Sequence, residues 1–152
     1  MDLNLKGKTA IISGGNKGLG AASAMALAAE GANVFLTARN ADDLQSTADE
    51  ISAAYGVEVG QLALDITDDG AGEKIVEAAL GQFENIDILV NAAGAARGGV
   101  FHDIEDQVWR DAFELKFLGA VKLTRALVPH MQAKRARELD RKSTRLNSSH
   151  VE

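Results

Sequence analysis

Short apolar runs alternate with longer helix-like stretches along most of the chain. The apolar runs have the length of β-strands and are nearly continuous, as expected of strands that are covered on both faces. The stretches between them are long enough for helices. We therefore predict strands at residues 8–13, 33–37, 57–64 and 86–90, helices at residues 21–30, 41–55 and 70–83, and a long helix from about 105 to at least 131.

Residues that start or stop helices support these boundaries. Gly31 is expected to end the first helix in a left-handed conformation. Asn40 is expected to cap the second helix, and Asp68 or Asp69 the third. Pro129 is expected to lie close to the end of the long helix, because proline removes a helical hydrogen bond.

Aromatic residues recur at helical spacing in the long helix. Trp109, Phe113 and Phe117 are each four residues apart, so they lie on one face of a helix. We predict that this face packs in the core.

The alternation of strands and helices predicts a parallel sheet with right-handed crossovers. We expect a Rossmann-like, doubly wound α/β fold, truncated to about four strands in the order 3-2-1-4. In such sheets ligands bind at the carboxyl ends of the strands. The polar or glycine-flanked positions Ser13, Ala38, Asp65 and Asn91 all stand at predicted strand ends, and they therefore predict one site.

A glycine-rich loop, residues 13–20, joins the first strand to the first helix. Gly14, Gly18 and Gly20 lack a Cβ atom, so the backbone can turn sharply and a phosphate can approach closely. The following helix directs its free N–H groups and its positive dipole end at that phosphate. A flexible turn is the alternative, but the flanking strand and helix favour nucleotide binding.

The end of the second strand selects the cofactor. An acid there would hold the ribose hydroxyls of NAD, but the sequence continues from Ala38 to Arg39 and Asn40. Arg39 and Lys17 could both bind a 2′-phosphate, which favours NADP over NAD. The alternative is that both are ordinary surface charges. A methyltransferase is disfavoured, because its methyl donor carries no phosphate for these cations to bind.

Two further strand ends offer contacts for a dinucleotide. Asp65 could accept a hydrogen bond from the adenine amine, or it could simply shape the turn at residues 65–68. The small residues of the segment 91–94 would let a ribose or nicotinamide lie against the backbone, or they could form only a tight turn.

Composition narrows the class of protein. The net charge of -6 and the pI near 5.1 argue against binding to nucleic acid or anionic membranes. There is no cysteine, and His102, His130 and His150 lack metal-ligand spacing, so no metal site is expected. We find neither a signal peptide nor an apolar run of membrane-spanning length, which favours a cytoplasmic protein.

These motifs together resemble the N-terminal part of a short-chain dehydrogenase/reductase. The resemblance covers about residues 5–131 and includes the glycine loop, Asp65, and an Asn-Asn-Ala-Gly segment in which Ala92 replaces the second asparagine. It implies an NADP(H)-dependent enzyme that interconverts carbonyl and alcohol groups on a small molecule, in a homo-oligomer paired through the long helix. The implied cofactor-binding residues are Ser13, Gly14, Asn16, Lys17, Gly18, Leu19, Gly20, Arg39, Asp65, Ile66, Asn91, Ala92, Ala93 and Gly94.

The family's catalytic residues have no counterpart in this sequence. The family uses a serine, a Tyr-x3-Lys pair and an asparagine of the long helix. The single tyrosine, Tyr55, is followed four residues later by Val59, and Lys116 occupies the asparagine position. We therefore predict no catalytic residue here. Either the chain is the cofactor-binding part of such an enzyme, or it is a non-catalytic dinucleotide-binding module, or it is a fragment that does not fold, with its fourth strand left as an open edge.

The sequence changes character after the long helix. Residues 132–152 are basic and hold no β-branched run, so we expect a disordered or non-native tail after a domain at residues 1–131. The segment 140–150 resembles, letter for letter, a translated sequencing-library adapter, which predicts a gene fragment joined to adapter sequence. Contact of the basic run with nucleic acid or acidic lipid is disfavoured, because no aromatic residues are interleaved.

Overall fold

The computed structural model describes residues 2–95 and 98–148. Its strands form one parallel sheet with the order β3-β2-β1-β4. The strands are β1 (Thr9–Ser13), β2 (Asn33–Ala38), β3 (Val59–Ala63) and β4 (Ile88–Asn91). The predicted doubly wound α/β fold and its strand order are confirmed.

The register of the sheet aligns the strand ends. Ser13 at the end of β1 lies opposite Thr37 of β2 and Asn91 of β4. On the outer side of β2, Ala38 lies opposite Ala63 of β3. The loops that leave β1, β2, β3 and β4 therefore all start from one edge of the sheet.

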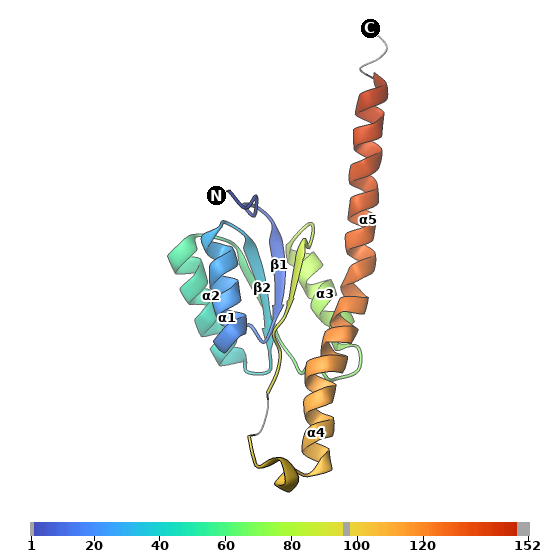
Figure 1. Cartoon of the computed structure of the whole chain (residues 1–152). Helices are drawn as coiled ribbons and strands as arrows, with labels where there is room; N and C mark the ends of the chain where they lie inside the picture. Colours follow the sequence, from blue (N-terminus) through green and yellow to red (C-terminus); the bar gives the residue numbers. More distant parts are fainter. Residues whose placement is uncertain (1, 96–97, 149–152) are drawn as a thin grey trace.

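Helices cover both faces of the sheet. In Figure 1, α1 (Gly18–Ala29) and α2 (Ala41–Tyr55) lie on one face, and α3 (Ala71–Gln82) and α5 (Gly119–Ser148) on the other. A short 3-10 helix η1 (Phe101–Asp103), the helix α4 (Asp106–Phe113) and a π-helical turn η2 (Glu114–Leu118) connect β4 to α5.

The alternation of side chains along the strands divides the core into two clusters. Ile11 and Phe35 pack with Ile75 of α3 and Leu123 of α5 on one face. Adjacent strand positions face the other way and pack against α1 and α2. That second cluster contains Ala10, Ile12, Ala24, Ala28, Val34, Leu36, Leu44, Ala48 and Ile51.

The observed caps agree with the sequence at two helices and differ at the third. Gly31 adopts a φ of 81° after α1, and the Asn40 side chain accepts a hydrogen bond from the Asp43 N–H, as predicted. The prediction that Asp68 or Asp69 caps α3 is wrong. Gly70, with a φ of 72°, is the cap residue and makes no side-chain bond. Asp68 contributes its main-chain carbonyl instead, which accepts from the Ala71 N–H.

The long helix differs from the prediction in its continuity and its end. It is interrupted by η2, and α5 then continues past Pro129 to Ser148 (Figure 1). Proline costs one helical hydrogen bond, but the residues after it, such as Ala133 and Lys134, favour the helix strongly enough to extend it. Residues 132–148 are thus helical in the structure, and residues 149–152 lie outside the described part.

The prediction that the aromatic face packs in the core is wrong. Trp109, Phe113 and Phe117 are 49%, 57% and 53% exposed. They contact aromatic neighbours instead. Phe113 stacks on Phe117 with ring centroids 4.9 Å apart, and Trp109 meets Phe101 edge-on at 5.7 Å. Figure 1 shows the reason, since α4 extends beyond the end of the sheet, where the described chain places no second layer over it.

Candidate functional site

A pocket lies at the carboxyl edge of the sheet, where the sequence predicted a site. It has a volume of about 340 Å³ and is bounded by the glycine loop and by the loops that follow β2, β3 and β4. Its lining consists of Ser13, Gly14, Asn16, Lys17, Thr37, Ala38, Arg39, Asn40, Asp43, Leu64, Asp65, Ile66, Ala93, Gly94, Ala95 and Leu115.

The glycine loop lies tightly against the end of β4. Gly14 has a φ of 68°, and a Cβ atom at this position would lie 2.8 Å from the Ala92 carbonyl oxygen. The Gly14 N–H donates to the Thr37 carbonyl at 2.8 Å, which fixes the loop to β2 as well. No side chain caps the first turn of α1 after Lys17. The N-terminus of α1 is therefore held in place with its first N–H groups left for a ligand.

Ser13 holds the glycine loop to β4. Its side chain is buried, its hydroxyl accepts from the N–H groups of Ala92 and Ala93 at 3.1 and 3.2 Å, and it donates to the Val90 carbonyl at 3.4 Å. Ser13 was predicted as a ligand contact. In this structure its hydroxyl is used to shape the site, a role that the sequence alone gave no sign of.

Lys17 and Arg39 line the same pocket, as the cofactor hypothesis requires. Asp43, which the sequence analysis missed, brings a carboxylate to the same lining. The side-chain amide of Asn16 donates to Asp43 at 3.4 Å. The position of Asp43 in the first turn of the helix after the second strand was the available signal, because such turns face the strand's carboxyl edge.

Asp65 shapes the turn at residues 65–68 and also lines the pocket, and its contact with adenine stays a prediction. Its carboxylate accepts from the Thr67 N–H at 2.9 Å and from the Thr67 hydroxyl at 2.7 Å. The bond from the Thr67 main chain is the largest influence on the pKa of this carboxyl and outweighs burial. The Thr67 hydroxyl and the positive charge of Arg39 act in the same direction, so the pKa of the Asp65 carboxyl lies below its ordinary value.

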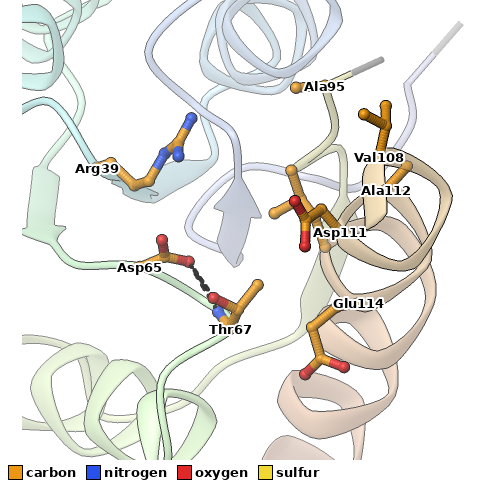
Figure 2. A pocket seen from close by; sticks show the side chains of 9 residues that line it. Arg39, Asp65, Thr67, Ala95, Val108, Asp111, Ala112 and Glu114 are labelled. Atoms are coloured by element: carbon orange, nitrogen blue, oxygen red, sulfur yellow. Dashed lines mark hydrogen bonds between the residues drawn. The ribbon is translucent and has the colours of Figure 1, made fainter. Parts of the chain in front are cut away.

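A second pocket of about 360 Å³ adjoins the first and extends it toward α4. Figure 2 shows Arg39 and Asp65 on one side of it and residues of α4 on the other. The lining residues from α4 and η2 could not be predicted from the sequence, because only the tertiary fold brings these two elements opposite the end of β3. These residues are Val108, Asp111, Ala112, Glu114 and Leu115.

The remaining predicted residues do not belong to the lining of the pocket; they are Gly18, Leu19, Gly20, Asn91 and Ala92. Gly18 and Leu19 begin α1 and are exposed, whereas Gly20 is buried against Gly14. The Asn91 side chain donates to the Thr124 hydroxyl at 3.2 Å and so turns toward α5.

Lys116, at the position of the family asparagine, lies in the π-helical turn η2. Its aliphatic carbons lie against Gly94, where a Cβ atom would come within 3.1 Å of the Lys116 Cε. π-Turns inside helices are rare and occur frequently at functional sites. The lysine therefore borders the segment on which a ribose or nicotinamide was predicted to lie.

The described residues, 2–95 and 98–148, contain no cluster of side chains that could hold a metal ion. None of their helices combines the length and apolar character needed to cross a bilayer.

The chain is similar in sequence to known dehydrogenases and reductases. Residues 8–138 match the family described as short chain dehydrogenase. A short chain dehydrogenase of Pseudocercospora fijiensis is 40% identical over 129 residues, which is 84% of this chain and 41% of that protein. The chain spans about half of the length of the curated relatives it matches.

Solved structures agree with these relatives. L-sorbose reductase from Gluconobacter frateurii, in complex with NADPH and L-sorbose, is 36% identical with a TM-score of 0.82, and the match covers 88% of this chain and 51% of that one. An alcohol dehydrogenase from Thermococcus sibiricus, in complex with 5-hydroxy-NADP, is 28% identical with a TM-score of 0.79, and the match covers 84% and 55%.

Proposed function

Because the chain belongs to the short-chain dehydrogenase family, we propose that it binds NADP(H) as the cofactor-binding part of an oxidoreductase. The whole protein would interconvert a carbonyl and an alcohol on a small molecule and would act as a homo-oligomer. NADPH supplies the hydride in such a reaction. Two structural neighbours, at 36% and 28% identity, hold NADPH and an NADP derivative, which supports this cofactor class.

The observation that carries the choice of NADP over NAD is the shared position of two cations. Lys17 from the glycine loop and Arg39 from the end of β2 line one pocket, and no acid stands at residues 37–40. A 2′-phosphate between them would be bound by an ammonium and a planar guanidinium. The hydroxyls of NAD would meet the same cations, and the end of β2 itself offers no carboxylate to bind them.

The other predicted contacts would each bind a different part of the dinucleotide. The open first turn of α1 would bind the diphosphate through its N–H groups. Asp65 would accept the adenine amine. Gly94 would let the nicotinamide ribose lie on the backbone, next to the Lys116 side chain.

For the chain itself, a non-catalytic dinucleotide-binding module is the second candidate. The observation that favours it is the location of Tyr55, which ends α2 and is 41% exposed. The pocket lies at the opposite end of α2, beside Asn40 and Asp43. We therefore expect binding without turnover, since no phenol is placed to exchange a proton with a substrate oxygen.

The test is a comparison of NADPH and NADH binding, followed by cofactor fluorescence and paired with a turnover assay on generic ketones. Wild type should bind NADPH more tightly than NADH and should turn over neither cofactor. A Lys17→Ala, Arg39→Ala double variant should lose about tenfold or more in NADPH affinity, on the scale of charge-assisted bonds, and should bind NADH nearly as before. Lys74→Ala on α3 is the matched control. A double variant that keeps the wild-type preference contradicts the cofactor assignment.

A further inference from the structure

Lys122 of α5 connects two elements that form the pocket walls. Its ammonium donates to the Glu114 carboxylate at 2.8 Å and to the Thr67 main-chain carbonyl at 3.2 Å. The side chain is 27% exposed, and Glu114 is 39% exposed. Glu114 belongs to η2, and Thr67 belongs to the loop after β3. A single cation thus holds the turn at residues 65–68 to the π-helical turn η2.

Two glycines bring α5 close to the loop after β3 and to the helix α3 that follows this loop. A Cβ atom on Gly119 would lie 3.0 Å from the Ile66 Cγ2, and one on Gly72 would lie 2.8 Å from the Lys122 carbonyl oxygen. The backbone of α5 can approach the loop closely because Gly119 lacks a side chain, and it can approach α3 closely because Gly72 lacks one. The Lys122 bonds therefore join surfaces that are already packed together, and their entropic cost is smaller than for an exposed ion pair.

The contacts continue from Thr67 into the pocket. The Thr67 N–H and hydroxyl both donate to Asp65, and Asp65 lines both pockets. Glu114 lines the second pocket, whereas Lys122 is absent from both linings. Any effect of Lys122 on a ligand must therefore pass through Thr67 and Glu114.

We infer that Lys122 is a positioning residue for cofactor binding: from α5 it fixes the turn at residues 65–67, against which the adenosine of the dinucleotide lies. The inference rests on the proposed function for its ligand. Its structural part, the fixing of the turn, does not require a ligand. The hydrogen bond with Glu114, and the negative charge of that residue, raise the pKa of Lys122, so the lysine stays charged at neutral pH.

The experiment compares Lys122→Met, which keeps the aliphatic stem and removes both bonds, with Lys74→Met on the exposed side of α3. The first measurement, on the ligand-free chain, is amide hydrogen exchange at Thr67 and Asp68. We expect faster exchange there in Lys122→Met alone, with the amides of β1 unchanged.

The second measurement is the Kd for NADPH and for adenosine 2′,5′-bisphosphate. We expect both to weaken by the same factor of about ten, because the lost bonds act on the adenosine end. Lys122→Arg should restore most of the affinity.

Each other outcome has a defined meaning. Unchanged exchange in Lys122→Met overturns the inference, and so does faster exchange with unchanged affinity for adenosine 2′,5′-bisphosphate. A loss for NADPH alone also overturns it, because the effect would then lie outside the adenosine site. If wild type binds neither probe, the proposed function fails, and the exchange data by themselves decide whether Lys122 holds the turn.

Discussion

Gly20 lies where the first turn of α1 meets the glycine loop. A Cβ atom there would be 2.1 Å from the Gly14 carbonyl oxygen, which is backbone and can move only if the loop moves. Gly20→Ala should therefore destabilise the fold by about 1–3 kcal/mol, the range for overpacking, and should weaken NADPH binding. Urea unfolding measures the first effect and fluorescence titration the second.

The control for that substitution is Gly81→Ala in α3. A Cβ atom on Gly81 would meet nothing within 4 Å, so the same change should stabilise the chain by about 0.5–1 kcal/mol through the lower entropy of the unfolded chain. Equal effects at the two positions would contradict the close approach of α1 to the loop.

Asp43 places a negative charge in the pocket that holds Lys17 and Arg39. A 2′-phosphate bound there would be repelled by this carboxylate. Asp43→Asn should therefore tighten NADPH binding by about twofold to tenfold, as expected for one partly solvated charge, and should leave NADH affinity nearly unchanged. Asp42→Asn removes the same charge from the neighbouring exposed position and should do much less. If the two variants behave alike, only the net charge matters.

The sequence allowed part of this site to be predicted. Lys17, Arg39 and Asp65 could be placed because each follows directly from a strand end or the glycine loop. Asp111 and Glu114 could not be placed, because they reach the second pocket only through the packing of α4 and η2 opposite β3. Residues brought in by tertiary contacts carry no local signal.

At the scale of elements, Asp87 connects the start of β4 to β1 and α5. It accepts from the Thr9 N–H at 3.0 Å and from Lys134, and the Lys8 ammonium lies 3.8 Å away. Burial of Asp87 acts to raise the pKa of its carboxyl. The Lys134 hydrogen bond, the Thr9 N–H and the charges of both lysines outweigh burial and lower that pKa below its ordinary value.

A pH dependence follows from the sign of this shift. A carboxyl with a lowered folded-state pKa adds stability above its unfolded pKa of about 3.9, and the stability is lost as the pH falls through the folded-state pKa. Asp87→Asn should lower the free energy of unfolding by about 1–3 kcal/mol at pH 7 and by less at pH 3. The free energy of unfolding of the variant should therefore vary less between these two pH values than that of wild type. Urea unfolding at both pH values is the measurement. Asp42→Asn, an exposed acid, should keep the wild-type pH dependence.

The elements themselves were predicted where local signals and packing agree. The strands follow from short apolar runs and the helices α1, α2 and α3 from the longer stretches between these runs, and the two core clusters bury the apolar side chains of both. The errors lie where the tertiary context decides. Phe113 and Phe117 have core-like spacing but lie on a helix that extends beyond the sheet. Pro129 has a local tendency to end a helix, which the helix-favouring residues after it overcome.

At the scale of the whole molecule, the described chain forms three layers, helices on both faces of one sheet, with one long projecting helix (Figure 1). Both outer strands of the sheet, β3 and β4, are edges. Exposed apolar residues gather on η1, α4 and η2 and along α5, among them Phe101, Trp109, Phe113, Phe117, Val121 and Val128. Such a surface is favourable for association, and the pairing of the whole protein through the long helix stays a prediction.

The projecting end of α5 is where the domain boundary can be tested. The pocket is lined by residues that all precede position 116, and the family match ends at residue 138. Lys134, whose ammonium binds Asp87, lies before the adapter-like segment. A chain shortened to residues 1–141 should therefore bind NADPH with less than about a twofold change in Kd and should keep the wild-type unfolding free energy, as expected for a remote, independent change.

A second truncation supplies the contrast. A chain shortened to residues 1–132 lacks Lys134 and so loses the bond to Asp87. It should be destabilised by about 1–3 kcal/mol, like Asp87→Asn, since both leave one member of the same half-buried ion pair without its partner. If instead the shorter removal, residues 142–152, already weakens NADPH binding tenfold, the adapter-like segment takes part in the folded domain. Calorimetric melting of the two truncated chains beside the full one separates these outcomes.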